Sequence, residues 1–419
     1  MKTFKKNIYT LLFCFIVQPI CAQTTSITDQ AKAAGTGIQH IRWGSSKNPL
    51  EGLTITWSSS GTKDLIRWGY THGYEKGVFS AVSRKGYTDD FFNYAFPRLK
   101  PGATLYYQIL DSHTGAWTRE KTYRTAPPVN TKKFSFLAIG DSRTGLNIWN
   151  QVASLADTKA PDFTIFSGDI VNSGKSTADW DNWFNNGKTF IENNLIFHSM
   201  GNHDAASVPT YQNVFELPKS VPETGTNLYY AFTYGDAVFI SLNSEDAAGT
   251  EQYNWLLETL KINATKKWKI IFFHKPFYTV GGHAGEMDSY FSTWWKAFDD
   301  YGVDLIVNGH DHMYERTKPL NRNVSISAPV AEYGSRPGQG RCEIVCGGAG
   351  APLYSGTASW FIEAVESKYN LCKFDVTENS ICNTTFDHKG NIIDSFCLTK
   401  NTPGKSSKQT LKKGIPVKP

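Results

Sequence analysis

Hydrophobic and polar residues follow two different rhythms along this chain. Between about residues 37 and 123, short apolar stretches such as LTITWSS and TLYYQIL are separated by glycine and proline. Short alternating stretches between such turns predict antiparallel strands packed as a β-sandwich. From Phe134 onward, apolar runs of strand length alternate with stretches of helical length, as in FSFLAIGD followed by LNIWNQVASLAD. This second rhythm predicts an α/β layered domain.

The change of rhythm predicts two domains joined by a short hinge after Ala126. We expect an all-β sandwich of the fibronectin or immunoglobulin type over residues 36–127, because LKPGATLYYQI places a Pro-Gly turn before a tyrosine-rich strand. We expect the α/β domain over residues 133–397, with two long helices at 177–193 and 287–302 among its elements. Antiparallel strands after Cys342 close this domain.

The first 22 residues have the features of a signal peptide. MKTFKK supplies positive charge, IYTLLFCFIV is an apolar run of about ten residues, and a small residue, Ala22, precedes Gln23. A membrane anchor is the alternative, but a span needs about 20 apolar residues. We therefore predict cleavage after residue 22 and a secreted or periplasmic location. No later segment of the sequence is long and apolar enough to cross a membrane.

The formal net charge of +5 comes from the two ends of the chain. Three lysines lie in the predicted signal peptide, and six more lie between Lys400 and Lys418 with no acidic residue among them. Without these nine lysines the remaining charge is −4. A mildly acidic body argues against dedicated nucleic-acid binding. The basic stretch over residues 398–419 predicts a disordered tail.

Five cysteines follow the predicted cleavage point, and all lie in the last fifth of the chain: Cys342, Cys346, Cys372, Cys382 and Cys397. In an exported protein they predict one or two disulfides between C-terminal strands, with at least one thiol left unpaired. Two cysteines four residues apart on one strand are separated by about 13 Å and do not pair with each other. Metal binding by these cysteines is a weaker interpretation because no Cys-x-x-Cys pair occurs.

Polar residues follow five apolar runs of the second domain, in FLAIGD, TIFSGD, IFHSMGNHD, IIFFH and LIVNGHDH. Because ligand sites in α/β sheets lie beyond the carboxyl ends of the strands, these polar ends are expected to meet at one rim. The side chains concerned are Asp141, Asp169, Asn202, His203, Asp204, His274, His310 and His312.

These residue types select a metal chemistry. Carboxylates, imidazoles and an amide oxygen without any thiol suit first-row metal ions. Two ions about 3.5–4 Å apart can clamp a phosphate and lower the pKa of a bound water. Each motif alone is weak, since a Gly-Asp at a strand end is mostly a turn. The ordered set of five motifs is the specific signal.

That ordered set resembles the calcineurin-like metallophosphoesterases, and most closely their purple acid phosphatase branch, which joins a fibronectin-like domain to the catalytic domain. The stretches GHDHMYERTKP and CEIVCGGAGAPLY extend the resemblance, which covers roughly residues 36–397. It implies a four-layer αββα metallophosphoesterase domain with two metal ions, each of them Fe, Zn or Mn.

The resemblance also implies a role for each motif residue. Asp141 and His312 would hold the first ion, and Asp169 would bridge the two. The second ion would be held by three residues: Asn202, His274 and His310.

Three further residues would act on the substrate. His203 would contact the phosphate and protonate the leaving oxygen, with Asp204 orienting it. His283 follows His274 by nine residues, where the family places a substrate-contacting histidine; a histidine of a flexible glycine loop is the alternative.

Three positions depart from the family pattern. GDIVN has Asn172 where the purple enzymes have an iron-binding tyrosine, so a purple iron(III) protein is not expected, although Asn172 could help hold the first ion. GDSRTG has Arg143 where many phosphoesterases have a histidine ligand. Arg143 is predicted either to grip a phosphate oxygen or to form a surface salt bridge. Asp204 stands where the branch usually has glutamate.

Together these features predict an exported phosphoric ester hydrolase that cleaves phosphate monoesters of small molecules by attack of a metal-bound hydroxide. One alternative is a phosphodiesterase acting on nucleotides or other diesters. The other is a non-catalytic binding protein on the same scaffold.

Overall fold

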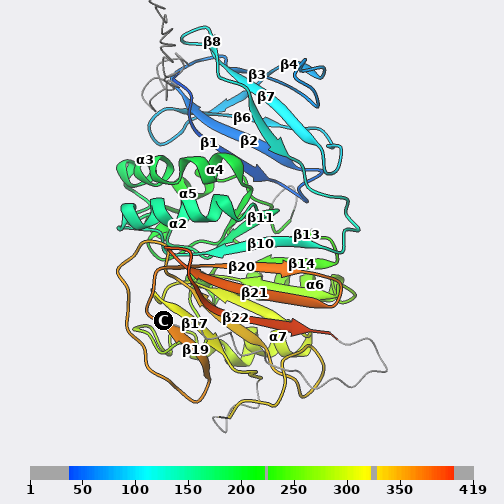
Figure 1. Ribbon diagram of the computed structural model, residues 1–419, viewed down its shortest axis with the longest axis vertical. Coiled ribbons are helices and arrows are strands. Elements are labelled where there is room, and N and C mark those ends of the chain that lie inside the picture. The colour runs from blue at the N-terminus through cyan, green and yellow to red at the C-terminus, as the bar shows by residue number, and fades with distance from the viewer. Residues whose placement is uncertain (1–36, 222–224, 322–327, 401–419) are drawn as a thin grey trace, which may run out of the picture.

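The computed structural model describes residues 37–221, 225–321 and 328–400, and its N-terminal part consists of two antiparallel sheets (Figure 1). The predicted signal peptide, and the predicted tail beyond residue 400, lie outside these residues. One sheet has the order β1 (Gln39–Ser45), β2 (Leu53–Ser59), β6 (Asp90–Ala95), β5 (Val82–Arg84). The other has the order β4 (Gly77–Ser80), β3 (Leu65–Gly69), β7 (Thr104–Asp111), β8 (Ala116–Trp117), with β9 (Lys121–Arg124) also paired to β7. Trp43 of β1 packs edge-on against Tyr107 of β7, with ring centroids 5.4 Å apart, so the core lies between the sheets.

The second part contains two larger mixed sheets. One has the order β12 (Ile196–His198), β11 (Phe163–Phe166), β10 (Phe134–Ile139), β20 (Asn370–Val376), β21 (Ser380–Asp387), β22 (Ile392–Thr399). The other has the order β13 (Tyr230–Tyr234), β14 (Ala237–Ser241), β15 (Trp268–Phe272), β16 (Leu305–Asn308), β18 (Cys342–Cys346), β17 (Tyr314–Thr317), β19 (Ile362–Glu366). Strands β10 to β12 are parallel to one another, as are β14, β15, β16 and β18.

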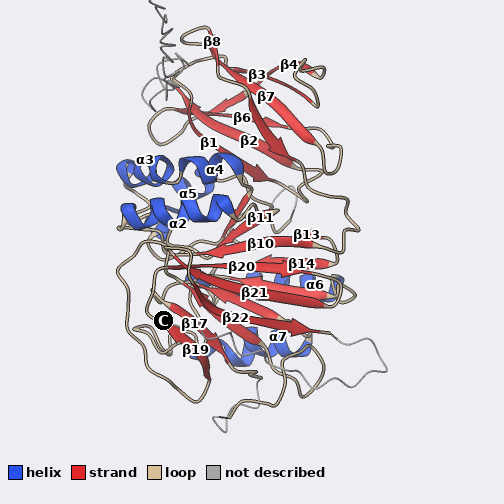
Figure 2. Cartoon of the chain, viewed as in Figure 1, coloured by secondary structure: helices blue, strands red, loops and turns tan. Residues whose placement is uncertain are grey.

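These two sheets face each other and carry helices on their outer faces (Figure 2). Between the sheets, Phe136 meets Phe239 with ring centroids 5.1 Å apart. Outside the first sheet lie α2 (Leu146–Thr158), α3 (Thr177–Asn186), α4 (Lys188–Asn193) and α5 (Val208–Val214). Outside the second lie α6 (Thr250–Ile262) and α7 (Lys296–Asp300), and the ring of Trp294, just before α7, lies 5.5 Å from the ring of Phe273, the residue after β15. The parallel strands are mostly apolar and buried because they lie between covering layers, although β15 carries Lys269 and β18 carries Glu343.

Two helices predicted as continuous are interrupted. The helix expected over 177–193 breaks at Gly187, where a Cβ atom would lie 2.6 Å from the Trp149 ring of α2. The helix expected over 287–302 is a short 3₁₀ turn (Asp288–Tyr290), a π-helical turn (Phe291–Trp295) and then α7. The wider π turn allows the adjacent Trp294 and Trp295 to be buried together.

The N-terminal sandwich abuts the segment from α4 to α5. Trp43 of β1 forms a parallel bridge with Leu195, and its indole donates a hydrogen bond of 2.9 Å to the Glu192 carbonyl oxygen. The buried Arg42 donates from Nε to the Val214 carbonyl oxygen at 2.6 Å. The sandwich therefore supports the stretch of chain that carries the GNHD motif.

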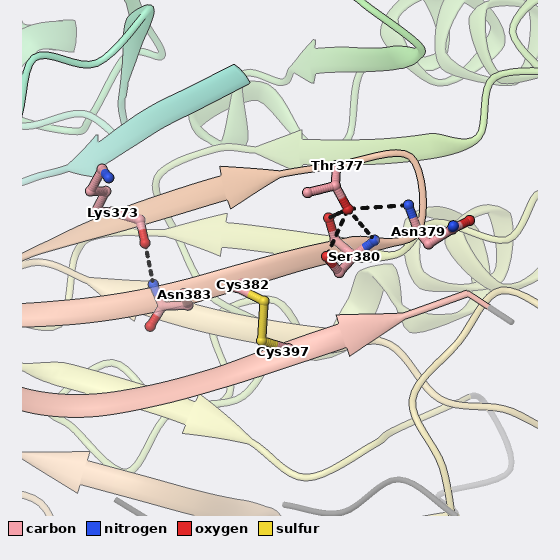
Figure 3. Close-up of a disulfide and its surroundings, with 7 residues drawn as sticks. All are labelled: Lys373, Thr377, Asn379, Ser380, Cys382, Asn383 and Cys397. Atoms are coloured by element: carbon pink, nitrogen blue, oxygen red, sulfur yellow. Dashed lines mark hydrogen bonds between the residues drawn. A yellow bond between two sulfur atoms is a disulfide. The ribbon is translucent and has the colours of Figure 1, made fainter. Parts of the chain in front are cut away.

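One disulfide ties the last two strands together, as the cysteine pattern predicts (Figure 3). Cys382 and Cys397 lie opposite each other in β21 and β22. The remaining three, Cys342, Cys346 and Cys372, are buried free thiols.

Candidate metal centre

The predicted motif residues meet where the carboxyl ends of β10, β11, β12, β15 and β16 come together. The two sheets join directly at this rim, because the backbone N–H of His310, after β16, donates to Asp141 Oδ2, after β10, at 2.9 Å. Asp169 follows β11, Asn202 follows β12 and His274 follows β15. The topology thus brings together side chains that are up to 171 residues apart in the sequence.

The backbone at the rim turns sharply. Asp141, Asp169 and His310 have positive φ angles of 60°, 53° and 71°, a conformation that non-glycine residues adopt rarely and that is concentrated at functional sites. A Cβ atom on Gly201 would lie 2.3 Å from Asp169 Oδ1, and one on Gly309 would lie 2.3 Å from Asp141 Oδ2. The glycines of the motifs are therefore needed for close approach of the backbone to the carboxylates.

One half of the site, here called the convergent corner, consists of Asp169 Oδ1, Asn202, His274 and His310. His274 is buried, and its Nδ1 lies 2.8 Å from the Ser167 carbonyl oxygen, which accepts the hydrogen on that nitrogen. His274 Nε2 then faces three electron-pair donors: Asn202 Oδ1 at 3.0 Å, His310 Nδ1 at 3.1 Å and Asp169 Oδ1 at 3.4 Å. The lone pairs of these four atoms repel one another. Only a proton or a cation between them can offset that repulsion.

The electrostatic environment of the convergent corner also favours a positive charge. Although burial opposes a charge on His274, the Asp169 and Asp141 carboxylates raise its pKa to about 10. Burial, together with the charge on His274, holds the pKa of His310 far below its usual value. Atoms of Asp141, Asp169 and His274 lie within 4.8 Å of one another, which is close enough to share an ion. The residues of the convergent corner fit a metal ion with nitrogen and oxygen ligands.

The other half of the site, here called the arginine corner, consists of Asp141, Asp169 Oδ2, Arg143 and His312. Arg143 Nε donates to Asp169 Oδ2 at 3.1 Å, and its Nη2 lies 3.3 Å from His312 Nε2. His312 Nδ1 lies 2.8 Å from the Pro352 carbonyl oxygen, so its hydrogen is on Nδ1 and its Nε2 lone pair accepts from the guanidinium. Asp141 Oδ1 lies 3.6 Å from His312 Nε2 and is buried without a hydrogen-bond partner among the described residues. Arg143 is paired with Asp169 and His312 inside the site rather than in a surface salt bridge, and its predicted contact with a phosphate oxygen stays a prediction.

His203 lies over Asp169 at the open side of the site. Its backbone N–H donates to Asp169 Oδ1 at 2.9 Å, and its Nε2 lies 3.9 Å from Asp169 Oδ2. Its Nδ1 lies 2.6 Å from the Asn172 carbonyl oxygen. Since that carbonyl accepts the Nδ1 hydrogen, Nε2 is the nitrogen that points toward Asp169.

The sequence-based interpretation expected Asp204 to orient His203, but the structure shows that it does not. Its buried carboxylate accepts backbone hydrogen bonds from Ile170 at 3.0 Å, from Gly201 at 3.0 Å and from Val171 at 3.3 Å. It therefore holds the loops after β11 and β12 together. The Asn172 carbonyl takes the orienting role, which no side-chain pattern could have revealed.

Asn172 reaches the site through its backbone. Its side-chain Oδ1 accepts from the Thr144 hydroxyl at 3.3 Å rather than from any group of the arginine corner. The geometry therefore gives no support to Asn172 as a ligand of the first ion.

His283 lies beside the convergent corner, with its ring centroid 3.7 Å from that of His310. Its Nδ1 lies 2.9 Å from Oδ1 of the buried Asp311, and Thr279 and Glu315 extend this network behind it. A histidine held by a buried carboxylate is fixed in orientation, unlike a histidine of a free glycine loop. The sequence analysis predicts no role for Asp311, the third residue of GHDH.

Tyr354 is a second residue that the sequence interpretation left without a role. Its ring stacks on His312 with centroids 4.2 Å apart, and its backbone N–H donates to the His312 carbonyl oxygen at 3.0 Å. It fixes the plane of the His312 ring. Its position in CGGAGAPLY, a stretch used for the family resemblance, was the available signal.

The fold and the rim of nitrogen and oxygen donors define a metallophosphoesterase-like class, and comparisons with known proteins agree. Residues 134–314 match the family model of the calcineurin-like phosphoesterases. Purple acid phosphatase 21 of Arabidopsis thaliana is 25% identical over 315 residues, covering 68% of this chain and 69% of that protein. An uncharacterized protein of Mycobacterium tuberculosis is 24% identical over 339 residues, which cover 69% of this chain but only 63% of that protein's length.

A solved structure shows the same fold. The purple acid phosphatase PPD1 from yellow lupin (Lupinus luteus) seeds superposes with a TM-score of 0.72 at 18% identity, covering 87% of this chain and 74% of that one. These matches confirm the resemblance to the calcineurin-like metallophosphoesterases and their purple acid phosphatase branch. Among the described residues, no helix meets the length and hydrophobicity needed to cross a membrane.

Proposed function

We propose that this chain is an exported, metal-dependent phosphatase that hydrolyses phosphate monoesters of small molecules. The observation that carries the proposal is the convergent corner, where three donor atoms lie 3.0–3.4 Å from His274 Nε2. The names of the relatives, purple acid phosphatases, support the same reaction class. The catalytic domain would span residues 133–397, and a fibronectin-like sandwich over residues 36–127 would brace it.

Four residues would hold the metal ion of the convergent corner: Asp169, Asn202, His274 and His310. Such an ion, when bound, polarises a phosphate oxygen and lowers the pKa of a water molecule at the site. Fe, Zn and Mn all accept this set of nitrogen and oxygen ligands. A second ion, expected from the sequence, would require Asp141 and His312, whose surroundings differ.

Three side chains of the chain itself would act on the substrate. Arg143 has N–H groups left over after its contacts with Asp169 and His312, and a guanidinium suits the planar geometry of phosphate oxygens. His203, protonated on both nitrogens, would keep its Nδ1 hydrogen on the Asn172 carbonyl and pass its Nε2 proton to the leaving oxygen. His283, fixed by Asp311, would donate from Nε2 to a phosphate oxygen at the rim.

The proposal is tested by activity measurements on the purified protein loaded separately with Zn²⁺, Mn²⁺ and Fe²⁺. We expect hydrolysis of p-nitrophenyl phosphate to exceed that of bis-p-nitrophenyl phosphate, and His274→Ala to remove the activity while circular dichroism and the melting temperature show a folded protein. Faster cleavage of the diester would indicate a phosphodiesterase instead of a phosphatase. Inactivity with every metal would favour a binding protein.

Export is tested by the N-terminus of the protein recovered from its native host. We expect it to begin at Gln23, after the predicted signal peptide. A mature chain that retains residues 1–22 would contradict this part of the proposal.

A further inference from the structure

We propose that the guanidinium of Arg143 takes the place of one metal ion, so that this chain binds a single ion, in the convergent corner. This inference rests on the proposed function, because it concerns the same site. The proposed one-ion centre differs from the two-ion centre that the motifs imply. In it, the Arg143 side chain supplies the second positive charge.

The first argument concerns the lone pairs that an ion in the arginine corner would need. His312 has its hydrogen on Nδ1, held by the Pro352 carbonyl, so Nε2 has the only lone pair that could bind an ion. That lone pair accepts from Arg143 Nη2 at 3.3 Å. An ion and a guanidinium N–H cannot use the same lone pair at once.

The bridging carboxylate gives the second argument. Asp169 Oδ1 faces the convergent corner, 3.4 Å from His274 Nε2, whereas Oδ2 accepts from Arg143 Nε at 3.1 Å. Each oxygen therefore serves one cationic position. An aspartate can bridge two ions by offering one oxygen to each, and here the second oxygen is paired with the guanidinium.

Ligand count gives the third argument. With His312 Nε2 and Asp169 Oδ2 paired to Arg143, the corner retains one donor without a hydrogen-bond partner among the described residues, Asp141 Oδ1. The Asn172 amide, the remaining candidate, is turned to Thr144. Ions of this kind take at least three protein ligands in catalytic sites, so one free oxygen is too few.

The fourth argument is charge. A guanidinium stays protonated throughout the accessible pH range, and it carries only hydrogen-bond donors. It therefore stays paired with the buried Asp169 and offers nothing to a metal. A second dication beside it would face direct repulsion in a largely buried setting, since only 15% of the Arg143 side chain is exposed.

The test is the number of ions bound at saturation with Mn²⁺ or Zn²⁺, measured on the full chain by native mass spectrometry and elemental analysis. We expect one ion in the wild type, one in His312→Ala and none in His274→Ala. Arg143→Ala, which frees His312 Nε2 and Asp169 Oδ2, should bind two. Combining Arg143→Ala with His312→Ala should return the count to one. The matched control is Arg124→Ala, an exposed arginine on β9, which should leave the count at one.

A second readout is the electron paramagnetic resonance spectrum of the Mn²⁺-loaded protein. We expect the six-line signal of an isolated Mn²⁺ in the wild type, and a spin-coupled signal from two neighbouring ions in Arg143→Ala. If Arg143→Ala has a much lower melting temperature than the wild type, Arg143→Met, which keeps a long side chain, is used in its place. If neither folds, the wild type and His312→Ala still decide the matter.

Two results would overturn the inference: two ions in the wild type with one lost in His312→Ala, or one ion in a folded Arg143→Ala. Failure of the proposed function looks different. It would appear as no ion in the wild type, or as an ion that His274→Ala leaves in place.

Discussion

The convergent corner and the arginine corner share Asp169 but obtain positive charge in different ways. Around His274 Nε2, three donors lie within 3.4 Å, and among the described residues no guanidinium is paired with them. Around His312 Nε2, the Arg143 guanidinium is already in place at 3.3 Å. The two corners, both built from carboxylate and imidazole groups, therefore differ in whether a guanidinium is paired with them.

The comparison teaches that buried carboxylates specify a charge rather than a particular cation. Asp141 and Asp169 are both buried, and an isolated buried carboxylate is costly unless it is paired or coordinated. An ion would meet this need in one corner, and an arginine can meet it in the other. The ligand residues of a motif alone do not state how many ions are bound.

The largest expected effect separates the two corners directly. His274→Ala should lower turnover by at least about a thousandfold, because the charge stabilisation by a metal ion is worth several kcal/mol and each 1.4 kcal/mol is a factor of ten. His312→Ala should retain the ion and lower turnover roughly tenfold, because Arg143 loses its contact with His312 and is held less firmly. Steady-state kinetics with parallel metal analysis measures both. Equal losses of ion and activity in the two variants would erase the distinction between the corners.

The His203 imidazole lies 3.9 Å from Asp169 Oδ2 and should act on the proton of the leaving group rather than on the metal. His203→Ala should lower kcat by about 10²–10⁴-fold on an alkyl phosphate, the range expected for loss of a general acid. The loss should be much smaller on p-nitrophenyl phosphate, whose leaving group needs no proton. A loss that is the same on both substrates, or that comes with loss of the ion, would argue for a positioning or ligand role instead.

Much of this organisation could be predicted from the sequence, for identifiable reasons. The strands that end in FLAIGD and LIVNGHDH are mostly apolar because they are largely buried on both faces, so their ends could be predicted. β13, β17 and β19 were missed, because polar or charged residues interrupt their apolar pattern, as in YAFTY, YERT and IEAVE. The break at Gly187 depends on the Trp149 ring of another helix, and no local pattern carries that contact.

The site divides in the same way. Motif order placed His274 and His310 correctly at one rim, since strand ends converge by topology. The pairing of Arg143 with His312, and the orientation of His203 by a backbone carbonyl, depend on side chains meeting in space. Asp204 was misjudged because adjacency in sequence suggested a contact with His203, whereas its carboxylate points toward three backbone N–H groups.

A change far from both corners should alter stability without altering their chemistry. Replacing Cys382 and Cys397 by serine opens a link of 15-residue separation and should cost about 3 kcal/mol of unfolding free energy. Urea denaturation measures the loss, and the ion count and kcat at low temperature serve as controls. A changed ion count would mean that the corners depend on the C-terminal hairpin.

The smallest expected effect lies at the junction between the sandwich and the segment that carries the GNHD motif. Arg84 pairs with Glu216 at 3.2 Å, and both side chains are partly exposed, 28% and 27%. Arg84→Ala should therefore cost at most about 1 kcal/mol in thermal or urea unfolding. Both corners should keep their ion binding and their rates. A large drop in metal affinity would show that the sandwich positions the convergent corner more strongly than the packing indicates.

The most direct test of a one-ion, one-arginine centre is anomalous X-ray scattering from crystals grown with saturating Zn²⁺ or Mn²⁺. The account predicts one anomalous peak, bounded by Asp169, Asn202, His274 and His310, with the Arg143 guanidinium still against His312. A second peak between Asp141 and His312, with Arg143 displaced, would contradict it.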